Sequence, residues 1–115
     1  MNRDRLFLKD VLERCERVNR YVSHGREQFD TDEMLQDAIV RNLEVIGEAI
    51  NQVSDDARDL DKTVPWRQIV GMRNKLIHHY FGVNLDLVWE TALVMVPDLE
   101  DKVREVLVEL DRQGL

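Results

Sequence analysis

The apolar residues of this chain recur at steps of three and four over long stretches, and this period constrains the fold more than any other feature. The first stripe predicts a helix over residues 4–24, with Gly25 as its left-handed cap. The second predicts a helix over residues 30–55, and the third a helical region that starts after Gly82 with Asn84 as its N-cap. The stripes consist of Leu8, Val11, Cys15, Val18 and Val22, then Leu35, Ala38, Ile39, Ile46, Ala49, Ile50 and Val53, then Leu85, Val88, Ala92, Val96, Leu99, Val103, Val106 and Leu110.

The second predicted helix carries signals at its start and in its middle. Asp30 and Glu33 have the spacing of a capping box, and Phe29 against Met34 could form a hydrophobic staple. Gly47 lies in the middle, where a missing side chain can let another helix approach closely. Asn42 falls on the apolar stripe, and we interpret it as a hydrogen-bonded core or interface residue rather than a catalytic one.

The third stripe stays in phase across Pro97, which predicts a kinked helix or two closely stacked helices. The acidic residues of this region are expected to form a solvated face rather than a metal site. They are Asp98, Glu100, Asp101, Glu105 and Glu109.

Taken together, the pattern predicts one all-α domain over residues 1–115, a four- to five-helix up-and-down bundle. Five glycines and two prolines are too few for the turns of an all-β fold. Cys15, the single cysteine, is expected to be a buried small hydrophobe. Neither a signal segment nor a membrane span is evident, so we expect a cytoplasmic protein.

The segment from Trp66 to Phe81 concentrates the reactive residue types in a chain of net charge −7. Residues 62–85 contain four basic residues and no Asp or Glu, so this window is +4 and the remainder, with 12 basic and 23 acidic residues, is −11. A basic segment on an acidic body favours a focused anion site over a broad nucleic-acid face.

Helical geometry limits how this segment can form a site. Pro65 fits the first position of a further helix, which lies between the second and third stripes. The apolar arc of this helix includes Arg73 and Tyr80. On a straight helix His78 would lie about 140° from Arg73. Convergence of the two side chains therefore requires that the helix break near His79, that a second copy complete the site, or both.

Several kinds of chemistry find no support in the residues. The chain has no phosphate-binding glycine loop, no zinc motif and no serine in a nucleophile elbow. Its histidines are His24, His78 and His79, and no carboxylate lies near the last two in sequence. We therefore predict neither a metal site nor a cofactor.

An arginine and a histidine remain, and together they can cleave RNA without a metal. Arg73 could stabilise the charge on a phosphoryl group, while His78 carries the proton of the 2′-hydroxyl and Asn74 orients either group. From residue types alone the alternative is stronger, namely a structural arginine and two helix-terminal histidines.

The order of motifs along the chain favours the RNA-cleaving site over the structural alternative. Arg73-Asn74-x3-His78-x-Tyr80 resembles the Arg-polar-x-His motif of HEPN-domain ribonucleases, and more narrowly the HepT-like toxin family. The sequence Ile-Gly-Glu-Ala at residues 46–49, the Pro65-Trp66 helix start and the later Trp89 follow in the family order.

The resemblance implies a HEPN-like homodimer whose two motifs face a shared cleft, and a metal-independent endoribonuclease that acts as the toxin of a toxin–antitoxin pair. It also implies a minimal nucleotidyltransferase antitoxin as partner, which transfers AMP to Tyr80 and silences the toxin. The alternative is a non-catalytic module that binds a nucleotide or docks such a nucleotidyltransferase. The sequence assigns no role to Glu48 or His79.

Overall fold

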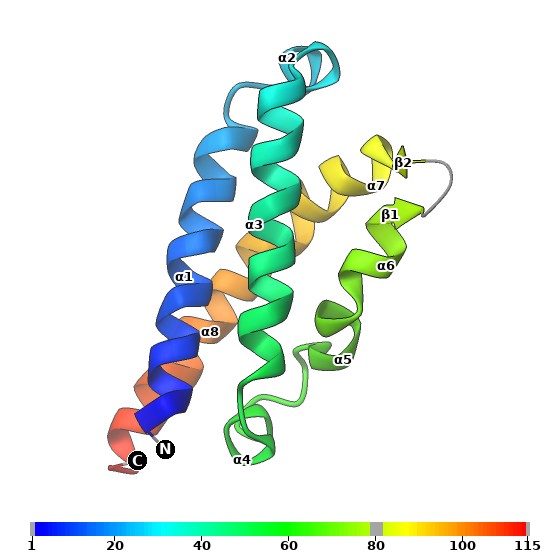
Figure 1. Cartoon of the computed structure of the whole chain (residues 1–115). Coiled ribbons are helices and arrows are strands. Elements are labelled where there is room, and N and C mark those ends of the chain that lie inside the picture. Colours follow the sequence, from blue (N-terminus) through cyan, green and yellow to red (C-terminus); the bar gives the residue numbers. More distant parts are fainter. Residues whose placement is uncertain (1, 79–81, 115) are drawn as a thin grey trace.

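The computed structural model describes residues 2–78 and 82–114, and it confirms the all-α prediction. Two long helices, α1 (Asn2–Val22) and α3 (Glu33–Asn51), lie side by side (Figure 1). The shorter elements are α2 (Arg26–Thr31), α4 (Asp55–Arg58), α5 (Trp66–Val70), α6 (Met72–Leu76) and α7 (Leu85–Glu90). A π-helical turn, η1 (Thr91–Met95), joins α7 to the long helix α8 (Val96–Arg112).

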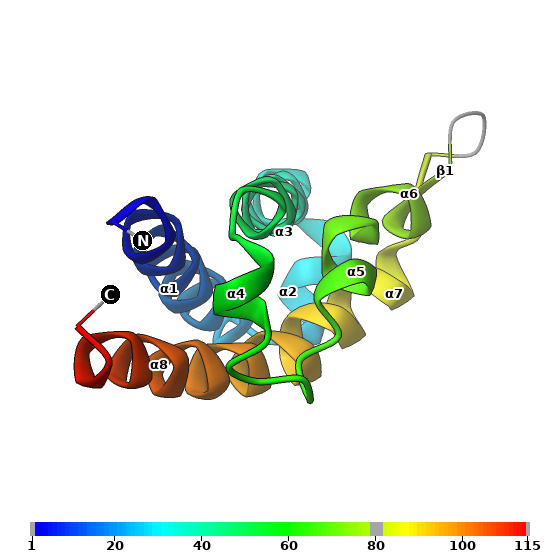
Figure 2. The same ribbon diagram turned by 90° about the horizontal axis from the view of Figure 1, so that it is seen from below.

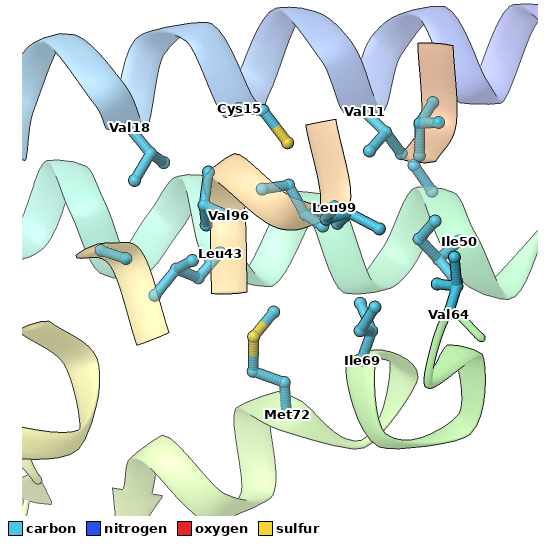
Figure 3. Packing of buried hydrophobic residues seen from close by; sticks show 14 of the residues in the cluster. Val11, Cys15, Val18, Leu43, Ile50, Val64, Ile69, Met72, Val96 and Leu99 are labelled. Carbon is cyan, nitrogen blue, oxygen red and sulfur yellow. The ribbon is translucent and has the colours of Figure 1, made fainter. Parts of the chain in front are cut away.

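The helices form two layers around one core. Seen from below in Figure 2, α3 lies between α1 and the α5–α6 segment, and α8 runs across the other side. Figure 3 shows apolar side chains from all these elements meeting in the middle. Those labelled are Val11, Cys15, Val18, Leu43, Ile50, Val64, Ile69, Met72, Val96 and Leu99.

A minimal antiparallel ladder is the only β-structure within the described ranges. Strand β1 (Ile77–His78) pairs with β2 (Gly82–Val83), with Ile77 opposite Val83 and His78 opposite Gly82. The backbone N–H of Asn84 donates to the carbonyl of Leu76 at 2.8 Å and closes the base of this hairpin.

The start of α3 differs from the prediction. The N-cap is Asp32, whose carboxylate accepts from the N–H of Leu35 at 3.0 Å, so the predicted capping box at Asp30 is wrong. The residues before it form the separate helix α2, which follows Gly25 at a φ of +90°. Met34 is 83% exposed and does not staple the helix.

Phe29 is buried and packs against Trp89 instead, with ring centroids 5.1 Å apart. The aromatic pair therefore ties α2 to α7, two elements that are distant in sequence. Sequence spacing could not show this contact, because it depends on how α7 folds back over the bundle.

The region around Pro97 is a continuous helical stretch that widens by one π-turn. The N–H of Val96 donates to the carbonyl of Thr91, a five-residue step. Because Pro97 has no N–H and its ring crowds the preceding turn, a locally wider turn accommodates it without ending the helix. The predicted N-cap, Asn84, is confirmed by its hydrogen bond from the N–H of Leu87 at 3.2 Å.

Side-chain hydrogen bonds hold the loops on either side of α4, between α3 and α5. The buried carboxylate of Asp4 accepts from the backbone N–H and the hydroxyl of Ser54, at 2.8 and 2.7 Å. The indole N–H of Trp66 donates to the carbonyls of Arg58 and Asp61, both at 3.0 Å. These bonds satisfy backbone groups where the chain turns from α3 toward α5.

Gly47 sits where α3 passes closest to α5. A Cβ at this position would lie 3.1 Å from the carbonyl oxygen of Ile69 and 3.6 Å from that of Val70. The predicted close helix approach is therefore confirmed, because an alanine side chain would press on backbone atoms, which cannot rotate away as a side chain can.

We expect Gly47→Ala to lower the free energy of unfolding by about 1–2 kcal/mol, because overpacking outweighs the gain in helix propensity. Urea unfolding followed by circular dichroism measures this. Gly71→Ala is the matched control, since its Cβ would meet the carbonyl of Arg67 at an ordinary 3.6 Å. A Gly47→Ala protein as stable as the control would contradict the close-packing account.

Candidate functional site

The motif segment does not form one straight helix. Gly71 separates α5 from α6, and the helix ends at Leu76, before the predicted break near His79. Pro65 is the N-cap residue of α5 rather than its first helical residue. A break of the kind we predicted is thus present but falls earlier, because β1 begins directly at Ile77.

Arg73 is exposed, which corrects its predicted place in the apolar arc. Its side chain is 63% accessible, while its neighbours Met72 and Leu76 are buried. The prediction assumed one unbroken helical phase from Trp66 onward. Because the backbone changes conformation at Gly71, the side chains of α6 do not continue the angular positions set by α5. Met72 therefore takes the buried position, and Arg73 does not.

A carboxylate that the sequence did not single out holds the arginine. Glu44 on α3 accepts a hydrogen bond from Nε of Arg73 at 3.1 Å, and its side chain is only 19% accessible. The two residues are 29 positions apart, so no local motif connects them. One sequence feature could have pointed to Glu44. It lies one helical turn before Gly47, where a close approach of another helix was predicted.

A small pocket of about 140 Å³ opens between α3 and the motif segment. Arg73 and Val70 line one side, and Glu44, Gly47 and Glu48 line the other. Glu48 faces this pocket as well, and its carboxylate lies 3.9 Å from Arg41. Within the described residues, the guanidinium of Arg73 forms its one hydrogen bond through Nε, so its two Nη groups are not engaged there.

His78 lies on a different element from Arg73, in strand β1. The 140° separation of a straight helix does not apply, because the chain has left the helical path at Ile77. His79, Tyr80 and Phe81 lie outside the described residues. Convergence of the His78 and Arg73 side chains stays a prediction. Asn74 is exposed on α6.

Other candidate groups have structural roles. Asn42 is buried, accepts from Arg14 at 3.3 Å and donates to the carbonyl of Ala38 at 2.7 Å, as its core interpretation predicts. Burial raises the pKa of the Cys15 thiol to about 12, with Glu100 contributing, so the group is a poor nucleophile near neutral pH.

Three of the five acidic residues predicted to form the solvated face of α8 have an ion-pair partner among the described residues. Asp98 contacts Lys102 at 3.1 Å, and Glu109 contacts Arg112 at 2.8 Å. Glu100 departs from the predicted solvated face, because it is 14% accessible and binds both Arg104 and Asn19. Among the described residues no cluster of three or more His, Cys, Asp or Glu side chains could hold a metal ion.

No described helix combines the length and the apolarity that crossing a membrane requires.

The all-helical bundle is the fold that the sequence resemblance led us to expect. The family model described as "Ribonuclease HepT-like" matches residues 11–106. The chain therefore belongs to the HepT-like family.

Relatives agree with this assignment over most of their length. A protein of Caldanaerobacter subterraneus subsp. tengcongensis named "Putative RNase TTE0752" is 44% identical, over 93% of this chain and 96% of its own. The "Probable ribonuclease HepT" of Thermococcus cleftensis is 36% identical, over 87% of this chain and 92% of its own. No solved structure gave a significant match.

The hydrogen bond between Glu44 and Arg73 can be tested without an activity assay. We expect Glu44→Ala to speed hydrogen exchange at Arg73 Nε severalfold, because the proton loses its acceptor. Nitrogen-15 NMR of arginine side chains measures this, with Arg73→Lys used to assign the signal. Glu48→Ala, one turn along the same helix, is the control and should leave the signal unchanged. Equal exchange in both variants would contradict the pairing.

Proposed function

We propose that this protein is a metal-independent endoribonuclease, the toxin of a toxin–antitoxin pair. Membership of the HepT-like family and the ribonuclease names of its relatives support the activity. The observation that carries the proposal is the exposed Arg73, held through Nε by Glu44 with both Nη groups unengaged by described residues. This edge of a guanidinium binds two oxygens of one phosphate.

The proposed reaction needs one base, one acid and one fixed cation. His78 removes the proton of a ribose 2′-hydroxyl, and the 2′-oxygen attacks the adjacent phosphorus. The bond from phosphorus to the 5′-oxygen breaks, and that oxygen takes up a proton from water, which acts as the acid. The products are a 2′,3′-cyclic phosphate and a free 5′-hydroxyl. Arg73 stabilises the negative charge on the phosphoryl oxygens in the transition state.

In this mechanism Glu44 positions the cation rather than touching the RNA. Its carboxylate fixes the orientation of the guanidinium, which lowers the entropic cost of forming two hydrogen bonds to phosphate. Its negative charge also offsets part of the attraction between Arg73 and RNA. Asn74, exposed beside Arg73 on α6, is the supporting residue that orients the phosphate or the histidine.

We further propose that the protein acts as a homodimer in which two motifs share one cleft. The family resemblance supports this arrangement. The placement of Arg73 and His78 on separate elements, α6 and β1, suits a site whose two halves are brought together by assembly.

The test is cleavage of single-stranded RNA by purified protein with a chelator present. We expect His78→Ala to lower the rate by about 10²–10⁴ and Arg73→Ala by about 10²–10³, with folding unchanged. Arg20→Ala and His24→Ala remove exposed residues of the same types outside the motif and are the controls. Equal cleavage by wild type and both motif variants would mean a contaminating nuclease.

Silencing by a partner is the last part of the proposal. A minimal nucleotidyltransferase would transfer AMP to the hydroxyl of Tyr80 and release pyrophosphate from ATP. The added phosphate brings negative charge to the motif that contains Arg73 and would repel RNA.

We expect intact-mass and peptide mass spectrometry to find one AMP group on Tyr80 after co-expression with such a partner. Tyr80→Phe should remove the modification. Tyr21, the other tyrosine of the chain, is half-buried on α1 and serves as the internal control, expected to stay unmodified. Modification at Tyr21, or none at all, would contradict this part of the proposal.

A further inference from the structure

Two hollows meet along helix α5 and form one groove, which we call the α5 groove. The larger has a volume of about 680 Å³ and the smaller about 230 Å³. Pro65 and Gln68 line both, so the two hollows adjoin at these residues. The larger one lies beside the loop before α5, where Lys62 and Arg67 line it.

The smaller hollow is mostly apolar and lies next to the motif helix. Buried Met72 and Leu76 of α6 line it, together with Met95 from η1. Lys75 and Thr91 add an ammonium and a hydroxyl. An apolar pocket with a few polar groups is the usual form of a small-ligand site, and π-turns occur often at functional sites.

The cations of the α5 groove differ from most others in the described part of the chain. Lys62, Arg67 and Lys75 are exposed, and none forms an ion pair with a described residue. Elsewhere ion pairs engage Arg5, Arg14, Arg17, Arg26, Arg41, Lys102, Arg104 and Arg112. The groove cations are therefore available to an outside anion.

The groove lies on the other faces of the helix that carries Arg73. Met72 immediately precedes Arg73 in α6, so their side chains are about 100° apart around the same helix axis, and Lys75 is about 160° from Arg73. A strand held by Arg73 therefore reaches the groove by passing around α6, which a flexible single strand of several nucleotides can do.

Asp55, Arg58 and Asp59, in and directly after α4, also line the larger hollow. The two carboxylates would favour a path for a polyanion along the α5 side, beside Lys62 and Arg67.

We propose that the α5 groove binds the single-stranded RNA that flanks the cleaved bond, an inference that rests on the proposed nuclease function. One base sits against Met72 and Met95, whose flexible side chains adapt to different bases. The backbone then follows Lys75, Arg67 and Lys62. The groove sets affinity for long RNA and contributes little to the bond-breaking step.

The first experiment measures how RNA affinity depends on salt. A labelled single-stranded RNA of about twelve nucleotides spans a groove of this kind. Binding is measured in a His78→Ala background, which prevents cleavage. Lys62→Gln, Arg67→Gln and Lys75→Gln combined should lower the slope of log K against log salt by about 2, since each phosphate contact contributes roughly 0.7.

The control removes three exposed cations from α1, with Arg3→Gln, Lys9→Gln and Arg20→Gln combined. It makes the same change in net charge, so it corrects for the general field of the protein. We expect its slope to match that of the parent. Equal slopes for the groove variant and this control would overturn the proposal.

A second experiment fills the apolar hollow without changing charge. Thr91→Phe should weaken binding of the same RNA by roughly five- to a hundredfold, the value of one lost base contact. Val94→Phe adds the same ring at an exposed position of the same π-turn outside the hollow, and should bind normally. Equal RNA affinity of the two variants would show that no base binds in the apolar hollow of the α5 groove.

Failure of the groove and failure of the nuclease give different results. If wild type cleaves RNA and Arg73→Ala does not, while the groove triple variant keeps its slope and its KM for long RNA, only the groove assignment falls. If neither wild type nor any variant cleaves RNA, but the groove variant has a reduced salt slope, the protein binds RNA through the α5 groove without cleaving it. The proposed nuclease function is then rejected and the groove proposal is kept.

Discussion

The close approach of α3 and α5 at Gly47 is the contact on which the site depends. The carbonyl of Ile69 occupies the space that a side chain would need. Glu44 lies one turn before this point on α3, and Arg73 lies four residues after Ile69. The same backbone contact therefore sets the distance between the carboxylate and the guanidinium, so packing and site geometry are coupled.

The break at Gly71 has a second consequence for the site. In one continuous helix Arg73 would have shared the apolar arc of Trp66 and Ile69. Because α6 starts afresh, Met72 and Leu76 enter the core and Arg73 reaches solvent with Asn74 and Lys75. Burial of two apolar side chains, each worth about 1.5–3 kcal/mol, thus holds the exposed edge of a short helix in place.

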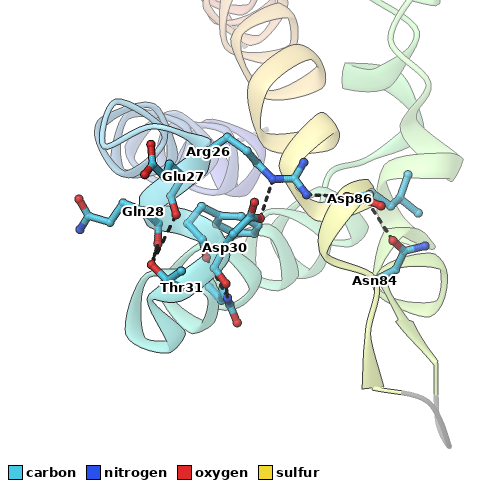
Figure 4. A network of polar contacts seen from close by, with 10 residues as sticks. Arg26, Glu27, Gln28, Asp30, Thr31, Asn84 and Asp86 are labelled. Atoms are coloured by element: carbon cyan, nitrogen blue, oxygen red, sulfur yellow. Dashed lines mark hydrogen bonds and ion pairs between the residues drawn. The ribbon is translucent and has the colours of Figure 1, made fainter.

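Described contacts on both sides of the hairpin after α6 join it to the bundle. The Asn84 N–H binds the carbonyl of Leu76, and the Asn84 side chain caps α7. Figure 4 shows how Arg26 then links α7 back to α2, through Asp86 at 2.5 Å and Asp30 at 2.7 Å. These pairs are exposed and screened by solvent, so the contact of the buried Phe29 ring with Trp89 matters more here.

The local period of apolar residues and short spacings were enough to predict the helical class, the buried stripes and the core position of Asn42. They could not predict the partner of Arg73, the pairing of Phe29 with Trp89 or the position of the hollows along α5, because these come from the packing of distant segments. Glu44 is 29 residues from Arg73, and only the packing of α3 on α5 brings them within hydrogen-bond distance. Contacts of that kind depend on the sum of many buried surfaces, which no local pattern contains.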